Sequence, residues 1–158
     1  MYSYIRTKKV YLLHWYGMIM RITQEGDYAL RVVLDLYRYS NGGRVEAKVI
    51  SAKENIPLRF LLKLLRKLSA AGIIRSYRGT GGGYAIDRPP SEVTVRQVIE
   101  AIEGPITVNR CLGDPAACNL NRTSTCGICH VLGDIQQKLV SNMDDATFET
   151  VLKAHREK

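Results

Sequence analysis

No apolar run in this 158-residue sequence reaches the roughly 18 residues that a membrane-spanning helix requires, so we expect no association with a membrane. The opening stretch MYSYIRTKKVYLLHWYGMIM places basic residues before apolar ones, as a signal peptide does. It lacks a small-residue cleavage site, however, and charged sequence resumes at Arg21. We therefore interpret residues 1–19 as an N-terminal extension outside the folded domain, and we expect a cytoplasmic protein.

Groups for acid–base catalysis are also scarce. The three histidines, His14, His130 and His155, are scattered along the chain, and no pair of carboxylates has a convincing spacing for a general acid and base. No lysine follows the glycines at residues 81–83, which excludes a phosphate-binding loop of the P-loop type. The sequence therefore predicts that the protein is not an enzyme.

Acidic residues are fewer than basic ones. The chain has 15 Asp and Glu against 23 Lys and Arg, and its formal net charge is +8. The excess of positive charge lies between Met20 and Arg88, whereas the remainder is nearly balanced. Such a basic half indicates a polyanionic partner. Charge alone does not exclude an ordinary solvated surface, so the arrangement of the basic residues has to decide.

Periodicity and capping residues predict a mainly helical chain with one hairpin. Thr23 is a candidate N-cap for the first helix, and Thr94 with Gln97 forms a capping box for a later one. The first helix is expected to bury the stripe Leu30, Val33, Leu34 and Tyr37, and the second Val49 and Ala52. The predicted helices cover residues 23–39, 48–55, 57–72, 94–103 and 132 to at least 143, and the hairpin covers residues 73–86.

This order of elements is that of a winged helix-turn-helix, a mainly α (α+β) fold with a β-hairpin wing. The third helix has two faces of opposite chemistry. The expected core face is Leu58, Leu61, Leu62, Leu65 and Leu68. The opposite face carries Arg59, Lys63 and Arg66, with Lys67 beside them, and such a cationic ridge suits the major groove of DNA.

The hairpin strengthens the interpretation that the protein binds DNA. Its turn, which includes Gly79, Thr80 and Gly81, lets the backbone approach phosphates closely. Arg78 at its edge is placed to enter a minor groove, where negative potential is concentrated. A plain β-turn would explain the glycines but not this arginine. The pattern therefore favours double-stranded DNA as the partner.

Cysteine is absent outside one short segment, which holds Cys111, Cys118, Cys126 and Cys129 and ends at His130. In a reducing compartment, clustered thiols more often bind metal than form disulfides. Four thiolates satisfy a 2Fe–2S cluster, a 4Fe–4S cluster or tetrahedral zinc. The spacing C-x6-C-x7-C-x2-C is longer than that of the usual zinc pairs and favours a cluster. A redox pair at Cys126 and Cys129 would need a βαβ context, which is not predicted here.

The stretches RITQEGDYALRVVLDL and IPLRFLLKLLRKLSAAGIIRSYRGTGGGYAI, together with the cysteine segment, resemble the IscR/NsrR/CymR family of bacterial winged-helix transcription regulators. The resemblance runs from Met20 to about Leu152. It implies a homodimer that binds operator DNA through Leu58, Arg59, Phe60, Lys63 and Arg78, and an iron–sulfur cluster held on the loop before the dimerisation helix.

The resemblance also frames the ligand set. Three cysteines, Cys111, Cys118 and Cys126, match the ligands of the family. Its cluster-assembly regulators place a histidine where this chain has Cys129, and its nitric-oxide sensors use an aspartate where this chain has Asp27. The fourth ligand is thus predicted to be Cys129 first, His130 second and Asp27 third, with a 2Fe–2S cluster favoured over 4Fe–4S.

The resulting prediction is a DNA-binding transcription regulator that senses iron–sulfur status, redox state or nitric oxide. The alternatives are a zinc-stabilised or cofactor-free winged-helix regulator, or a metal-dependent redox protein. Leu132, Ile135, Leu139 and Met143 form the apolar seam expected to make a symmetric dimer. The expected organisation is an extension (1–19), a winged helix-turn-helix (20–104), a cysteine-rich loop (105–130) and a dimerisation helix with its tail (131–158).

Overall fold

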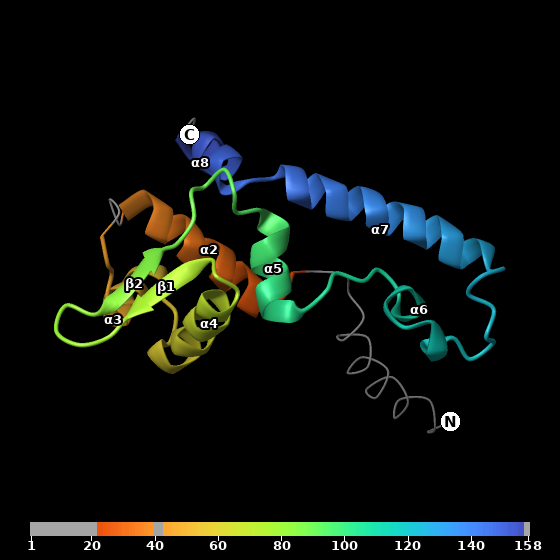
Figure 1. The fold of residues 1–158 in the computed structure, drawn as a ribbon, viewed down its shortest axis with the longest axis horizontal. Coiled ribbons are helices and arrows are strands. Elements are labelled where there is room, and N and C mark those ends of the chain that lie inside the picture. Colours follow the sequence, from red (N-terminus) through yellow and green to blue (C-terminus); the bar gives the residue numbers. More distant parts are fainter. Residues whose placement is uncertain (1–21, 40–42, 157–158) are drawn as a thin grey trace, which may run out of the picture.

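The structure is a computed structural model that describes residues 22–39 and 43–156, so the expected extension over residues 1–19 lies outside the described residues. Helices and one small sheet follow each other along the chain (Figure 1). The elements are α2 (Gln24–Tyr39), α3 (Ala47–Glu54), α4 (Leu58–Ala70), β1 (Ile74–Tyr77), β2 (Gly83–Ile86), α5 (Val95–Glu103), α6 (Arg110–Gly113), the 3-10 helix η1 (Pro115–Ala117), α7 (Gly127–Asp145) and α8 (Phe148–Arg156).

The hydrophobic core lies among α2, α3, α4 and α5, with α8 packed against α2. These helices and the two-stranded antiparallel sheet confirm a mainly α winged-helix fold. The predicted capping box is present, because Thr94 accepts from the Gln97 N–H and the Gln97 side chain accepts from the Thr94 N–H. Thr23 likewise caps α2 by accepting from the Gly26 N–H at 3.3 Å.

Two predicted buried faces were displaced from those in the structure. On α2 the fully buried side chains are those of Ala29, Val32, Val33 and Leu36, whereas Leu30, Leu34 and Tyr37 are only partly buried at its flank. On α3 the prediction was wrong, because Val49 and Ala52 are exposed and Ile50 enters the core instead. A helix of eight residues docks through so few side chains that periodicity alone does not identify the buried one.

The core face of α4 also differs from the predicted one. Leu61, Leu64, Leu65 and Leu68 are buried. Leu58 and Leu62, which were expected in the core, are half-buried and line a groove of ≈470 Å³ next to the hairpin. The hairpin is therefore not a detached feature, since its glycines form the opposite wall of this groove.

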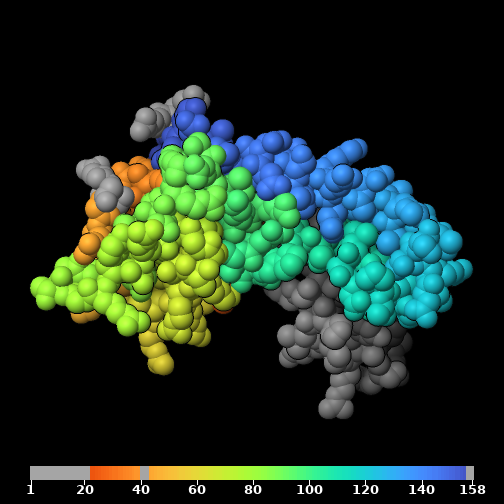
Figure 2. Space-filling view, in the orientation of Figure 1, coloured from red at the N-terminus to blue at the C-terminus, as the bar shows by residue number. Residues whose placement is uncertain are grey.

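The wing is the β1–β2 hairpin, in which Ile74 pairs with Ile86 and Tyr77 with Gly83. Val45 adds a bridge to Tyr84 through two backbone hydrogen bonds of 2.9 Å. Gly83 permits this close approach, because a Cβ at that position would lie 2.7 Å from the Val45 carbonyl oxygen. Figure 2 shows the wing projecting at one end of the molecule and the segment around residues 115–130 at the other.

After α5 the chain leaves the core and forms an arm, defined as residues 105–145, which contains α6, η1 and α7. The long helix begins at Gly127, with Cys126 as its N-cap, and ends at Asp145. The chain then returns to the core through α8, where Phe148 is buried and its ring lies 5.6 Å from that of Tyr37. Of the helices that the structure describes, none is long and apolar enough to span a membrane.

Candidate nucleic-acid interface and cysteine segment

The basic face predicted on α4 is exposed. Arg59, Lys63 and Arg66 all point to solvent, and within residues 22–39 and 43–156 none of them has an ion-pair partner. Phe60 is half-buried beside Arg59 and Lys63, and its ring packs edge-on against Tyr28 with the centroids 5.7 Å apart. Three unpaired cations on one helix face form a positively charged ridge available to phosphates and base edges.

A hollow of ≈460 Å³ lies beside the start of this ridge. It is lined by Gln24, Tyr28, Pro57, Arg59, Phe60 and Lys63. The Gln24 amide donates to the Tyr28 hydroxyl at 2.8 Å. The hollow is therefore lined by polar groups as well as by the aromatic rings of Tyr28 and Phe60. Sequence patterns did not reveal this contribution of α2, because Gln24 and Tyr28 are distant from α4 along the chain.

The wing turn is exposed at Arg78, Gly79, Thr80 and Gly81. Gly79 and Gly81 have φ values of 84° and 74°, a backbone conformation that suits glycine. Both glycines and Leu58 border the same groove, so the structure brings the predicted residues of the wing next to the start of α4. The two predicted parts of the interface are therefore neighbours.

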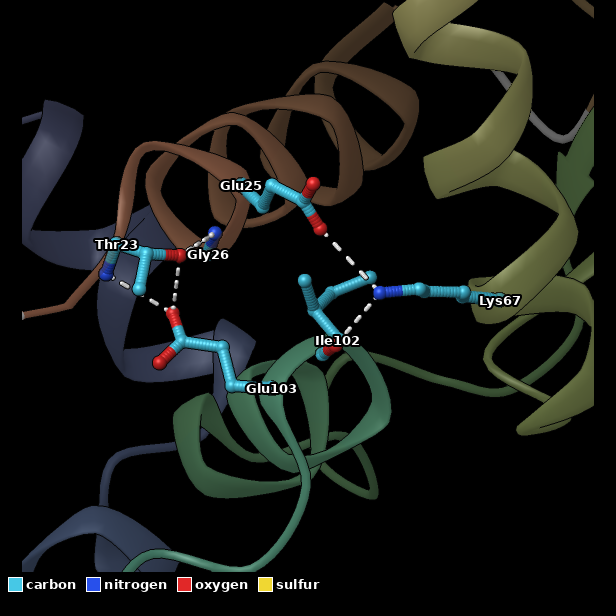
Figure 3. A network of polar contacts seen from close by, with 6 residues as sticks. All are labelled: Thr23, Glu25, Gly26, Lys67, Ile102 and Glu103. Atoms are coloured by element: carbon cyan, nitrogen blue, oxygen red, sulfur yellow. Dashed lines mark hydrogen bonds and ion pairs between the residues drawn. The ribbon is translucent and has the colours of Figure 1, made fainter.

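Lys67 differs from the other cations of α4. Its ammonium donates to the Ile102 carbonyl oxygen at 2.8 Å and lies 3.3 Å from Glu25 Oε2 (Figure 3). In the same network, Glu103 Oε1 accepts from the backbone N–H and the hydroxyl of Thr23, at 2.9 and 2.8 Å. The ends of three helices, α2, α4 and α5, thus meet in one set of polar contacts.

The four cysteines lie in different local structures. Cys111 belongs to α6, Cys118 follows η1, Cys126 caps α7 and Cys129 lies in the first turns of α7. The Sγ atoms of Cys111 and Cys129 are 3.9 Å apart, and Cys129 is the buried one. Two thiolates bound tetrahedrally to one metal ion at about 2.3 Å would be separated by about 3.8 Å, so this pair has the spacing of two ligands.

The complete ligand set is not assembled. Within the part of the chain that the structure describes, no group of three or more Cys, His, Asp or Glu side chains is close enough to hold a metal ion. The donor chemistry nevertheless fits a thiolate-bound centre, since four thiols share one segment and one pair already has ligand spacing. Cys118 and Cys126 would have to approach the Cys111–Cys129 pair.

The thiols of the segment differ in their protonation. Burial raises the pKa of the Cys129 thiol, and the neighbouring Cys111 thiol raises it further. Backbone N–H groups of Arg122 and Leu120 lower the pKa of Cys118, because they stabilise its thiolate. The surroundings therefore favour the thiolate at Cys118 and the protonated thiol at Cys129.

The two alternative fourth ligands point elsewhere in this structure. The Nε2 atom of His130 lies 3.0 Å from the Ser124 carbonyl oxygen, and its side chain is exposed. Asp27 is exposed on α2 and lies 3.7 Å from an Arg31 nitrogen. Of the three candidates, Cys129 is therefore the one that faces another thiol.

The family model for Rrf2, described as an iron-dependent transcriptional regulator, matches residues 22–154. The transcriptional regulator IscR of Yersinia pseudotuberculosis is 33% identical over 129 residues, which cover 81% of this chain and 76% of that protein. A candidate HTH-type transcriptional regulator of Haemophilus influenzae is 38% identical over 94 residues, a match that spans 63% of its length.

Solved structures agree on the fold. CymR, described as the global cysteine regulator of B. subtilis, is 27% identical, with a TM-score of 0.64 over 86% of this chain and 98% of that one. The IscR of T. potens is 23% identical, with a TM-score of 0.65 over 89% of this chain and 92% of that one, which supports the likeness of fold alone.

Proposed function

The chain belongs to the Rrf2 family of transcriptional regulators, and from this premise we propose that it is a homodimeric DNA-binding regulator whose cysteine segment holds an iron–sulfur cluster. Its relatives are transcriptional regulators, not enzymes. The observation that carries the proposal is the shared groove of Leu58 and the wing glycines beside an unpaired cationic ridge on α4.

In the proposed complex, α4 enters the major groove and the wing contacts the adjacent minor groove. Arg59, Lys63 and Arg66 supply charge, and Leu58 and Phe60 supply apolar contact to base edges. Arg78, Gly79, Thr80 and Gly81 form the part of the wing that approaches the DNA. Lys67 is left out of this set, because its ammonium is bonded within the protein.

The proposed cluster ligands are Cys111, Cys118, Cys126 and Cys129, with a 2Fe–2S cluster favoured over 4Fe–4S. The Cys111–Cys129 spacing supports Cys129 over His130 and Asp27 as the fourth ligand. A bound cluster would supply a centre that changes with redox state, iron supply or nitric oxide. The chain's part is to hold that centre on a segment that continues directly into α7.

The proposed dimer contact lies on α7. Ile128, Val131 and Ile135 follow each other at intervals of three and four residues, and their exposed fractions are 70%, 59% and 46%. Of the seam expected from the sequence, Ile135 belongs to this stripe, whereas Leu132, Leu139 and Met143 are half-buried. A stripe at helical spacing suits a symmetry-related copy of α7, and a two-fold dimer suits a palindromic operator.

These assignments keep the proposed division into a winged helix-turn-helix over residues 20–104, a cysteine-rich loop over 105–130 and a dimerisation helix with tail over 131–158. Along the chain, the proposed sensor lies between the DNA-binding part and the dimer contact. Loss of a bound cluster would release the segment that the cluster had ordered. Such an order-to-disorder change can alter the relative placement of the two recognition helices in the proposed dimer.

Purification without oxygen tests the proposal. We expect a visible absorbance spectrum together with stoichiometric iron and sulfide, and selection from a random-sequence DNA pool should return a palindromic duplex. Cys111→Ala, Cys118→Ala and Cys126→Ala should each abolish the spectrum while leaving a helical protein. Complete loss of colour in Cys129→Ala supports Cys129 as fourth ligand, whereas a retained but shifted spectrum supports His130 or Asp27.

Zinc is the second candidate, because four thiolates satisfy it equally well in tetrahedral geometry. Protein that contains zinc and no iron, and that binds the selected duplex identically after the zinc is removed, would make the thiols structural. The sensing function would then be wrong, while the DNA-binding assignment of α4 and the wing would stand.

A further inference from the structure

Lys67 sits at the edge of the basic ridge, yet its surroundings differ from those of its neighbours. Its ammonium has two acceptors within the chain, the Ile102 carbonyl oxygen and the Glu25 carboxylate, although the Lys67 and Glu25 side chains are each 44% exposed. Arg59, Lys63 and Arg66 have no ion-pair partner among the described residues. To bind a phosphate, the Lys67 ammonium would have to leave the Ile102 carbonyl oxygen and the Glu25 carboxylate, at a cost of about 1 kcal/mol or less for each contact.

The acceptor on α5 explains why a cation belongs at this position. Ile102 lies in the last turn of α5, where carbonyl groups lack intrahelical partners and the helix carries partial negative charge. The Lys67 ammonium satisfies one of these carbonyls and complements that charge. This contact ties the C-terminal part of α4 to the end of α5.

The same end of α5 is fixed to α2. Glu103 accepts two hydrogen bonds from Thr23, and Thr23 in turn caps α2 at the Gly26 N–H. Gly26 leaves room for this arrangement, since a Cβ there would collide with Glu103 Oε1. Figure 3 shows Lys67 reaching toward Glu25 and Ile102 from one side while Glu103 reaches Thr23 from the other.

Beyond Glu103 the chain passes through Gly104 and residues 105–110 to Cys111. This connection is held at both sides: the Ile106 N–H donates to Glu100 at 3.2 Å, and the Val108 N–H donates to Gln136 of α7 at 2.9 Å. The connection between the last turn of α5 and Cys111 is therefore short and is bonded to both α5 and α7. Besides the apolar packing of α4 on α5, Lys67 makes a hydrogen bond between the recognition helix and that turn.

We propose that Lys67 is a positioning residue of the recognition helix, which holds α4 to the end of α5 and transmits changes of the cysteine segment to DNA binding without contacting a phosphate. The proposal rests on the proposed function, in that it takes α4 as the DNA-reading helix.

Salt dependence of DNA binding separates this role from a phosphate contact. The variants are Lys67→Met, which keeps the aliphatic stem, and the matched control Lys63→Met, on the exposed ridge. Binding is measured to a duplex that the wild-type protein selects from a random pool and to one random-sequence duplex. Lys63→Met should reduce the slope of log K against log salt by about 0.9 on both duplexes, because one phosphate contact is lost.

Lys67→Met should leave that slope at the wild-type value and weaken binding to the selected duplex by about tenfold. Lys67→Arg should bind the selected duplex with wild-type affinity, because a guanidinium can reach the same carbonyl and carboxylate. Glu25→Gln, which leaves the Ile102 contact in place, should give a smaller loss in the same direction. Circular dichroism of each variant, before and after heating, establishes that it is folded.

The transmitting role is tested by combining Lys67→Met with Cys129→Ala. In the wild-type background Cys129→Ala should change affinity for the selected duplex, and in the Lys67→Met background that change should shrink toward none. A slope reduced as in Lys63→Met, or unaltered affinity in Lys67→Met, overturns the positioning role, and an equal effect of Cys129→Ala in both backgrounds overturns transmission. If the wild-type protein selects no duplex, the proposed function itself fails.

Discussion

The winged-helix half, residues 22–104, and the arm, residues 105–145, are built on different principles. The winged-helix half contains most of the buried apolar side chains of the described residues, from Ala29 to Ile102. In the arm Cys129 is the buried residue, and the 19-residue helix α7 buries no other. One region therefore carries its own core, and the other holds its place by different contacts.

Polar contacts help to hold the arm, beside half-buried apolar side chains of α7. Arg96 of α5 pairs with Asp144 of α7 at 2.8 Å, and Gln136 bonds the connection before α6. Exposed ion pairs and single hydrogen bonds contribute about 1 kcal/mol or less each. A long helix depends mainly on packing for its stability. We therefore expect the arm to depend on a metal at its thiols and on a second copy of α7, whereas the winged-helix half does not.

The largest expected effect breaks the core of the winged-helix half. Leu65 is fully buried, so Leu65→Ala should lower the free energy of unfolding by about 3 kcal/mol through lost transfer energy and a cavity. Leu120→Ala in the arm, where the side chain is 59% exposed, should change it by less than about 0.5 kcal/mol. Urea titrations of both variants measure the contrast, and equal losses would contradict the division into two regions.

Removing a metal bound at the thiols, as proposed, should open the arm to protease before the winged-helix half. Thiolate-bound metal that is present at about 100 times its dissociation constant stabilises the state that binds it by about 2.7 kcal/mol. Stripping it with a chelator, or introducing Cys111→Ala, should therefore expose residues 105–130 to protease. Mass spectrometry of the fragments should place the early cuts there and leave residues 22–104 intact. Cuts that begin within α2 or α4 would show that the two regions are not separate.

The apolar stripe on α7 gives a third contrast. Val131→Asp should raise the dimer dissociation constant at least tenfold, about 1.4 kcal/mol, because it places a carboxylate in an apolar contact. Gln137→Asp, at an exposed polar position of the same helix, is the matched control and should leave the dimer intact. Sedimentation over a range of concentrations measures both. A monomeric wild-type protein at micromolar concentration would refute the dimer altogether.

Much of the winged-helix half could be predicted from sequence because its signals are local. The capping box at Thr94 and Gln97, the N-cap at Thr23 and the hairpin with its glycine turn each involve residues close together in the chain, and all three are present. Periodicity also placed Arg59, Lys63 and Arg66 on one face of α4, and all three are exposed, whereas Lys67 is bonded to Ile102 and Glu25. The fold class followed from the order of these elements.

What sequence could not supply depends on partners far along the chain. Periodicity marks a helix but not which side its neighbours cover, and therefore Ile50 rather than Val49 is buried on α3. Lys67 has the sequence context of a ridge residue, and its partner Ile102 is brought to it only by folding. The packing of α8 on α2 includes the contact of Phe148 with Tyr37. These residues are far apart in the sequence, so no local sequence pattern predicts that contact.

The smallest expected effect concerns the hydrogen bond between α2 and the chain that connects β2 to α5. The Tyr37 hydroxyl donates to the Arg88 carbonyl oxygen at 2.9 Å, and its ring packs on Phe148. Tyr37→Phe keeps the ring and removes the hydrogen bond, so it should lower the free energy of unfolding by about 1 kcal/mol at neutral pH.

The pH dependence of this loss follows from the protonation of the hydroxyl. Burial raises the pKa of Tyr37 to about 12, above its ordinary value near 10. The folded state thus favours the protonated phenol. The contribution of the Tyr37 hydroxyl to the free energy of unfolding is therefore fully present below pH 10 and is lost as the pH rises toward 12. Urea titrations of wild type and Tyr37→Phe at pH 8 and at pH 11 should therefore show a smaller difference at the higher pH. An undiminished difference at pH 11 would mean that the Tyr37 hydroxyl is not buried beside Arg88 as described.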